Sequence, residues 1–229
     1  MLVVGFPSGV FQANCYLIAP GEGEACVVVD PGQDAEEPVA EALREHNLTP
    51  VAALLTHGHF DHVFAVTPIC DGNDIPAWIH PSDRELLSDP LKGLGRDAAA
   101  FFGGRIAVRE PAEVRELADG TVLDLAGLTI TVDHTPGHTR GSVIFRSDLE
   151  EGGRLVFAGD TLFAGSIGRT DLPGGDMRTM LESLRGKLLT LDDDTVVLPG
   201  HGGSTTIGRE RLSNPFLTGL EPLPARRGL

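Results

Sequence analysis

The stretch Thr56-His57-Gly58-His59-Phe60-Asp61-His62 follows directly on an apolar run over residues 51–55. A short apolar run bounded by a proline and a glycine is typical of a buried strand. The polar stretch therefore lies on the loop that leaves the carboxyl end of this strand, where open α/β folds place their ligand sites. His57 and His59 are two residues apart, so they can face the same side of an extended segment.

Imidazole and carboxylate groups are usual zinc ligands, with bonds of about 2.0–2.2 Å. The stretch holds four such groups, and they cannot all reach one tetrahedral ion and still leave room for a substrate. The pattern therefore indicates that they are divided between two ions. The alternative is a polar surface loop that is rich in histidine by chance, and further candidate ligands elsewhere in the chain argue against it.

Three further candidate ligands follow strand-like runs over residues 128–133, 155–158 and 195–198. Each lies in or beside a turn marked by glycine or proline. They are His138 in Thr135-Pro136-Gly137-His138-Thr139, Asp160 in Gly159-Asp160-Thr161, and His201 in Pro199-Gly200-His201-Gly202.

In this order the seven residues resemble the pattern of the metallo-β-lactamase superfold, H-x-H-x-D-H followed by a later His, a later Asp and a last His. The resemblance implies a four-layer α/β sandwich, αβ/βα, with the site at one edge where two sheets meet. It also implies two divalent ions, zinc or alternatively iron or manganese, since imidazole suits several metals. The implied first set is His57, His59 and His138, the second set is Asp61, His62 and His201, and Asp160 bridges both.

Within the superfold, two segments resemble the glyoxalase II (hydroxyacylglutathione hydrolase) group. They are Gly159-Asp160-Thr161-Leu162-Phe163 and Gly168-Arg169-Thr170-Asp171. The resemblance implies hydrolysis of a thioester such as S-lactoylglutathione by a metal-bound hydroxide, with Asp61 orienting the nucleophile. Arg169 aligns with a residue that contacts glutathione, or it is only a surface arginine, and Arg140 could add positive charge. The helical extension of full-length glyoxalase II has no counterpart here, so the thiol carrier stays open.

Three other functions remain as alternatives. An iron-dependent persulfide dioxygenase would use the same ligand types and shares the segment Gly168-Arg169-Thr170-Asp171. A phosphodiesterase would fit the superfold, but the net negative charge of the chain is unfavourable for a phosphodiester substrate. A non-catalytic binding protein would have no chemical need for a complete set of ligands.

The composition indicates one enzyme domain over residues 1–219 and a frayed tail over residues 220–229. The formal net charge of −15 argues against a nucleic acid or an anionic membrane as partner. No apolar run approaches the roughly 18 residues of a membrane span. Three dispersed cysteines, Cys15, Cys26 and Cys70, are expected to be reduced, Cys15 and Cys26 within buried strands. Cytoplasmic location is therefore expected, and the oligomeric state is left open.

The remaining elements are expected as follows. Strands are predicted at residues 3–6, 15–18, 25–29, 75–80, 121–125 and 142–146, and residues 114–117 are expected to begin a second set of strands. Helices are predicted at residues 34–47 and 177–189, after His62, over residues 83–87 and after Thr206. Asp30 is either a turn residue or, as in the resembled fold, an acceptor behind the metal ligands.

A few residues near the motifs are assigned no ligand role. His46, His80 and His134 match no ligand of the superfold, so we expect them to be structural. Residues 89–112 are rich in glycine and form either a packed surface loop or a lid over the site. Residues 150–153 are expected to form an exposed hairpin turn.

Overall fold

The computed structural model describes residues 1–94, 108–149 and 152–222. Its first six-stranded sheet runs in the order β1-β2-β3-β4-β5-β6. The first three strands form an antiparallel meander, and β3, β4, β5 and β6 are parallel neighbours. The strands are β1 (Leu2–Ser8), β2 (Ala13–Ala19), β3 (Ala25–Val29), β4 (Thr49–Leu54), β5 (Ala77–Ile79) and β6 (Val114–Glu116).

The second six-stranded sheet runs in the order β14-β13-β10-β9-β8-β7. It is antiparallel except where β10 and β13 run parallel. A short hairpin, β11 (Leu162–Phe163) and β12 (Ser166–Ile167), lies beside it. The sheet consists of β7 (Val122–Leu125), β8 (Leu128–His134), β9 (Val143–Asp148), β10 (Arg154–Gly159), β13 (Val196–Pro199) and β14 (Thr205–Thr206).

Alternating side chains hold the sheets together and attach the helices. In β2, Tyr16 and Ile18 enter the core between the two sheets, whereas Cys15 and Leu17 pack toward the helices. The same division holds in β9, where Phe145 faces the first sheet and Ile144 faces the other side. Successive side chains of a strand point to opposite faces, so strands that are buried on both faces are apolar throughout.

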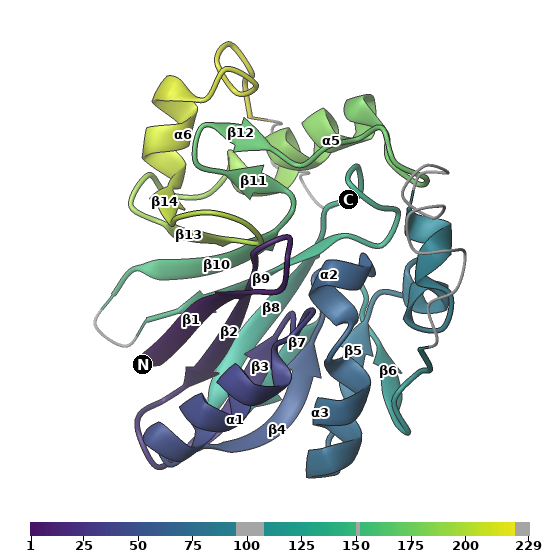
Figure 1. The fold of residues 1–229 in the computed structure, drawn as a ribbon. Coiled ribbons are helices and arrows are strands. Elements are labelled where there is room, and N and C mark those ends of the chain that lie inside the picture. The colour runs from purple at the N-terminus through teal and green to yellow at the C-terminus, as the bar shows by residue number, and fades with distance from the viewer. Residues whose placement is uncertain (95–107, 150–151, 223–229) are drawn as a thin grey trace.

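Helices cover both outer faces, as Figure 1 shows. On the first sheet, α1 (Glu36–Glu45) buries Val39 and Ala42, and α3 (Val66–Asn73) buries Ile69 and Cys70. On the second sheet, α5 (Met177–Ser183) and α6 (Ile207–Ser213) bury Met180 and Ile207. The predicted αβ/βα sandwich is therefore confirmed. The short helix α2 (Phe60–Val63) and 3₁₀ turns over Arg84–Leu87 and Pro90–Gly93 lie near the strand ends.

The prediction for residues 114–117 was wrong about the sheet. This strand, β6, pairs in parallel with β5 and completes the first sheet. Its residues are partly or fully exposed, and Arg115 lies over the Trp78 ring at 5.3 Å. A local apolar pattern identifies a strand but does not choose its partner.

Two predicted helices have different limits in the structure. The first begins at Glu36 because Asp34 has a left-handed backbone, with φ of 60°. The second ends as an α-helix at Ser183 and continues as a wider π-helical turn over Leu184–Leu188. Asp176 caps it by accepting a hydrogen bond from the Thr179 amide. The last predicted helix begins at Ile207, with Thr206 as its N-cap.

The remaining expectations concern the cysteines, a membrane span and three segments that lie wholly or partly outside the described residues. All three cysteines are buried and unpaired. Within the ranges described, no helix combines the length and the apolar character needed to cross a membrane. Most of the glycine-rich segment 89–112, half of the predicted turn 150–153 and most of the tail 220–229 lie outside the described residues.

Candidate metal centre

The motif lies where β4 gives way to α2. The strand ends at Leu54, the backbone of His59 is extended, and Asp61 and His62 occupy the first turn of α2. Position 58 requires glycine, because a Cβ there would lie only 2.8 Å from the side chain of Leu86 in the 3₁₀ turn Arg84–Leu87. The chain therefore presents two histidines from an extended loop and two ligands from a helix.

The first group consists of His57, His59 and His138, which are all buried. One nitrogen of each ring lies within 4.8 Å of the others, and His59 Nδ1 is 2.8 Å from His138 Nε2. His57 Nε2 and His59 Nε2 are buried and have no hydrogen-bond partner. Three imidazoles converge here with unsatisfied nitrogens, so this group could hold a metal ion.

The second group consists of Asp61, His62 and His201, whose ligand atoms also lie within 4.8 Å of one another. The Nε2 atoms of the two histidines are 3.2 Å apart. Asp61 Oδ2 is 3.4 Å from His201 Nε2 and 3.7 Å from His62 Nε2. One carboxylate and two imidazoles form a second set of the type that binds divalent ions.

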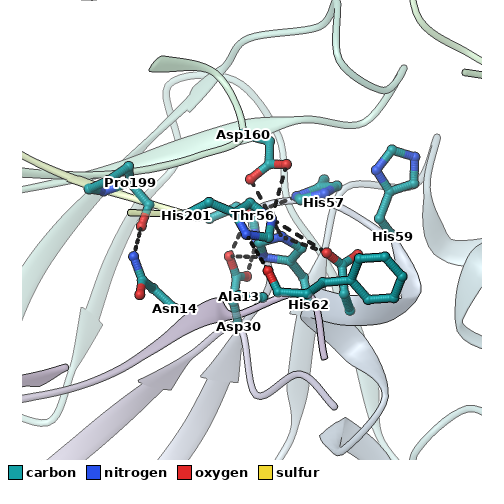
Figure 2. Close-up of polar contacts among 12 residues, drawn as sticks. Ala13, Asn14, Asp30, Thr56, His57, His59, His62, Asp160, Pro199 and His201 are labelled. Atoms are coloured by element: carbon teal, nitrogen blue, oxygen red, sulfur yellow. Dashed lines mark hydrogen bonds and ion pairs between the residues drawn. The ribbon is translucent and has the colours of Figure 1, made fainter. Parts of the chain in front are cut away.

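Asp160 lies between the two groups, in the turn after β10. Its Oδ2 is 3.4 Å from His138 Nε2 of the first group and 3.5 Å from His201 Nε2 of the second. Its Oδ1 is 3.4 Å from His62 Nε2 and has no hydrogen-bond partner although it is buried. Figure 2 shows Asp160 on one side of the histidine cluster and Asp30 on the other. A carboxylate in this position fits two ions better than one.

Asp30 lies behind the second group and connects it to the motif loop. Its carboxylate accepts hydrogen bonds from the Thr56 amide at 2.7 Å, from Thr56 Oγ1 at 2.6 Å and from His62 Nδ1 at 3.2 Å. Since Thr56 Oγ1 donates to Asp30, it can accept from His57 Nδ1, 3.0 Å away. Both histidines thus have their outer nitrogen occupied and their inner nitrogen directed toward the centre.

Backbone carbonyls fix two further histidines in the same way. His138 Nδ1 donates to the carbonyl of Arg169 at 2.7 Å, and His201 Nδ1 donates to the carbonyl of Phe11 at 3.1 Å. A carbonyl only accepts, so each Nδ1 carries a hydrogen and Nε2 is the nitrogen left to offer a lone pair to a metal. The four rings are therefore held in the tautomer that metal ligation requires.

Burial favours the uncharged form of two histidines in the first group, His57 and His59. Burial and the neighbouring histidines lower the pKa of His57 well below its usual value. Burial, with His138 beside it, lowers the pKa of His59 to about 3. Neutral imidazole is the form that binds metals.

Carboxylates dominate the electrostatics of the second group. Burial lowers the pKa of His62, but Asp160, Asp61 and Asp30 outweigh it and raise this pKa to about 10. Burial raises the pKa of Asp61, yet the nearby histidines outweigh it and hold this pKa well below its usual range. The acids thus keep a strong negative potential in which positive charge is favoured.

The two groups open into a cleft of about 450 Å³. Five of the candidate ligands line it, namely His59, Asp61, His138, Asp160 and His201. Volumes of this size are typical of sites for small molecules. The remainder of the lining is mostly apolar.

The two arginines considered from the sequence do not meet at this cleft. Arg169 lines it, and its guanidinium donates two hydrogen bonds of 2.8 Å to Asp171. Arg140 lines a separate cleft of about 130 Å³. Its carbonyl accepts a hydrogen bond from His134 Nε2, and the His134 ring stacks on His80 at 4.0 Å.

Asp83 was not predicted from the sequence, and it connects the two loops of the first group. This buried carboxylate accepts hydrogen bonds from the Gly58 amide at 3.0 Å, the Gly141 amide at 2.7 Å and Thr139 Oγ1 at 2.6 Å. Gly58 lies between two candidate ligands, and Thr139 follows His138 directly. The sequence carries no local signal for this role, because all three donors are distant in the chain.

Comparisons with known proteins agree with this fold. The family model "Metallo-beta-lactamase superfamily" matches residues 8–201. An uncharacterized protein of Mycobacterium tuberculosis is 51% identical over 96% of this chain and 99% of its own. Hydroxyacylglutathione hydrolase GloC of Haemophilus influenzae is 38% identical over 92% of this chain and 95% of its own.

Two solved structures are similar along nearly the whole chain. The B3 metallo-beta-lactamase BLEG-1 superposes with a TM-score of 0.83 and 41% identity, covering 95% of this chain and 100% of its own. TTHA1623, solved in a di-iron-bound form, superposes with a TM-score of 0.77 and 41% identity, covering 93% and 100%. The second structure indicates that iron as well as zinc has to be considered in such a site.

Proposed function

Since the chain belongs to the metallo-beta-lactamase superfamily, we propose that it is a metal-dependent hydrolase that cleaves thioesters. The observation that carries this proposal is the position of Asp160, between two complete ligand groups at one cleft. The residues fit two divalent ions, with His57, His59 and His138 holding one and Asp61, His62 and His201 the other. Asp160 would contact both.

Two such ions would lower the pKa of bound water and polarise a thioester carbonyl. Asp61 faces the cleft, where its carboxylate can orient the attacking water and take its proton. A carbon–oxygen bond forms, the carbon–sulfur bond breaks, and the thiol leaves with a proton. Asp30 and the backbone carbonyls hold the imidazoles in place throughout, since their hydrogen bonds point away from the cleft.

The relationship to GloC supports thioesters as the substrate class. A persulfide dioxygenase with one iron is the second candidate, because histidine and carboxylate ligands suit iron as well as zinc. TTHA1623 is solved with iron, although in a di-iron-bound form. The complete second group weighs against the dioxygenase. With a single ion in the first group, Asp61, His62 and His201 would converge without an ion to hold. A phosphodiesterase and a binding protein have no observation in their favour.

One preparation of the protein tests the proposal. Its metal content is measured, thiol release from S-lactoylglutathione and from simple thioesters is followed, and oxygen uptake with glutathione persulfide is recorded. We expect about two metals per chain and thiol release without oxygen uptake. One iron per chain with oxygen uptake and no thiol release would instead establish the second candidate.

A further inference from the structure

The cleft above the ligands has apolar walls. Three phenylalanines and three aliphatic side chains line it, and the polar groups lie mainly on its floor. The apolar lining residues are Phe11, Phe60, Phe163, Leu94, Ile167 and Leu172. An apolar cleft with few convergent polar groups selects the apolar part of its ligand.

One wall is formed by the loop between β1 and β2. Phe11 is 50% exposed, and its ring meets the Phe60 ring edge-on at 5.4 Å. The carbonyl of Phe11 also accepts the hydrogen bond from His201 Nδ1. Phe11 is therefore a half-exposed aromatic residue held beside the candidate metal ligand His201. Its ring can contact a substrate because it is not buried in the core.

A second wall is formed by the β11–β12 hairpin, which carries Phe163 and Ile167. Phe163 lies 6.0 Å from the His201 ring, centre to centre. The hairpin is held from behind, because the Gly165 amide donates to Glu210 Oε2 at 2.7 Å and Asn214 Nδ2 donates to the Ser166 carbonyl at 3.0 Å. Both apolar walls are thus positioned before a substrate binds.

Apart from the two proposed ions, positively charged side chains are scarce in this cleft. Among its lining residues within the described ranges, Arg169 is the cation with a permanent charge, and its Nε and Nη2 atoms already donate hydrogen bonds to Asp171, which offsets part of that charge. Asp61 and Asp160 on the floor are carboxylates. Glutathione carries two carboxylates of its own, and placing both in a cleft with mostly apolar walls and this one arginine is costly.

We propose that the substrate is a thioester with an apolar acyl group on an uncharged thiol, rather than a thioester of glutathione. This inference rests on the proposed function, because it names the substrate class of the same metal centre. The two phenylalanine walls bind the acyl chain beside the ligands. The catalytic groups on the floor then act on the carbonyl at its end.

Four substrates test this proposal with the metal-loaded protein. A hexanoyl and a lactoyl group are each placed on N-acetylcysteamine and on glutathione, and kcat and KM are measured for all four. We expect the hexanoyl ester of N-acetylcysteamine to exceed S-lactoylglutathione in kcat/KM by about tenfold or more, mainly through KM, since the extra methylenes are buried. An equal or higher kcat/KM for either glutathione ester than for its N-acetylcysteamine counterpart would overturn the proposal.

A charge variant tests the same point on the protein. Leu172→Lys places a cation in the cleft lining and should move the preference toward the glutathione esters. Leu212→Lys is the matched control, because Leu212 is 85% exposed and lies outside the cleft. An identical substrate preference in the Leu172→Lys variant and its control would contradict the proposal.

Binding separates this inference from the proposed function. The affinities of S-hexyl-N-acetylcysteamine and S-hexylglutathione, which cannot be hydrolysed, are compared by calorimetry. Tighter binding of the uncharged thioether without hydrolysis of any thioester would contradict thioester hydrolysis and keep the assignment of an apolar, uncharged ligand. Hydrolysis with tighter binding of the glutathione thioether would contradict only the substrate class.

Discussion

At the scale of single residues, Asp83 lies outside the two ligand groups but holds together the loops that carry the first group. Its buried carboxylate receives three hydrogen bonds from two loops that meet at the metal centre. An amide in its place would keep one acceptor oxygen but would turn an NH₂ group toward a donor. The loops that carry the first ligand group depend on this carboxylate for their spacing.

We therefore expect Asp83→Asn to lower the free energy of unfolding by about 1–3 kcal/mol, since it leaves buried donors unsatisfied. Its affinity for zinc should fall as well, because Gly58 and Thr139 adjoin first-group ligands. Urea unfolding of the metal-free protein and a zinc titration measure the two effects. Asp89→Asn, an exposed acid on the next turn, is the control, and equal zinc affinity in both variants would refute the positioning role.

Asp61→Asn should affect turnover more than substrate binding. The amide can still accept a hydrogen bond from water but cannot take its proton, so we expect kcat to fall by about 100-fold or more with a similar KM. Metal content is measured on the same samples, because Asp61 is also a proposed ligand. Wild-type kcat with full metal content would exclude Asp61 as the proton acceptor.

The sequence predicted which side chains gather at the site better than it predicted how they are held. The six-residue motif and three marked turns were sufficient to select seven residues that lie together in the structure. The groups that orient these ligands could be predicted only in part, because two of them are the backbone carbonyls of Phe11 and Arg169. Every residue has a carbonyl, so no residue type marks such a contact in a sequence.

At the scale of elements, Lys187 in the π-helical turn after α5 forms ion pairs with two aspartates at the second sheet. Lys187 Nζ lies 2.6 Å from Asp119 and 3.2 Å from Asp133. Burial lowers the pKa of Lys187, but the two acids outweigh it and raise this pKa. Burial raises the pKa of Asp119, but Lys187 and the His134 amide outweigh it and lower this pKa.

We expect Lys187→Met to reduce the free energy of unfolding at neutral pH by about 1 kcal/mol, a value limited by solvent screening. The lowered pKa of Asp119 contributes stability that is present above its ordinary value and is lost as the pH falls through the folded value. The raised pKa of Lys187 contributes stability that is lost as the pH rises through its folded value. The wild type and the variant should therefore differ between about pH 4 and 10 and converge below that range.

Denaturant unfolding across this pH range measures the difference. Lys92→Met is the control, since Lys92 pairs with Glu85 on an exposed turn and should change stability little. A constant difference between wild type and Lys187→Met down to pH 2 would show that lost packing, not the ion pair, is responsible.

Elements with a long apolar or capped pattern were predicted well, and so were several short ones such as β5 and β13, but the β11–β12 hairpin was not predicted. The β11–β12 hairpin has two residues in each strand and turns at Gly165, where φ is 76°. The π-helical turn at Leu184–Leu188 keeps the apolar stripe that predicted a regular helix. Periodicity reports which face is buried, and a short hairpin or one wider turn changes that signal too little to be noticed.

At the scale of the whole molecule, both ligand groups combine residues from the two halves. The motif loop after β4 in the first sheet supplies four candidate ligands, and loops around the second sheet supply His138, Asp160 and His201. Asn14 of β2 also reaches across, donating to the Pro199 carbonyl at 3.0 Å (Figure 2). Bound ions would therefore add a further connection between the two sheets, beside their shared apolar core and such hydrogen bonds.

Removing the metals should accordingly destabilise the whole fold rather than one loop. An ion present at 100 times its Kd stabilises the folded state by about 2.7 kcal/mol. For a chain of this size that corresponds to a fall in Tm of about 5–11 °C on chelation. Thermal unfolding followed by far-ultraviolet circular dichroism, with and without chelator, measures this fall, and readdition of zinc should reverse it.

Two histidine variants distinguish ligation from a general effect of the chelator. His46→Ala changes a histidine at the end of α1, so its Tm should fall on chelation as in the wild type. His201→Ala removes a residue shared by the second group and the contact to Asp160, so its fall should be smaller. If all three proteins respond equally, the second group does not hold a metal, and the function would have to be carried by the first group and Asp160 alone.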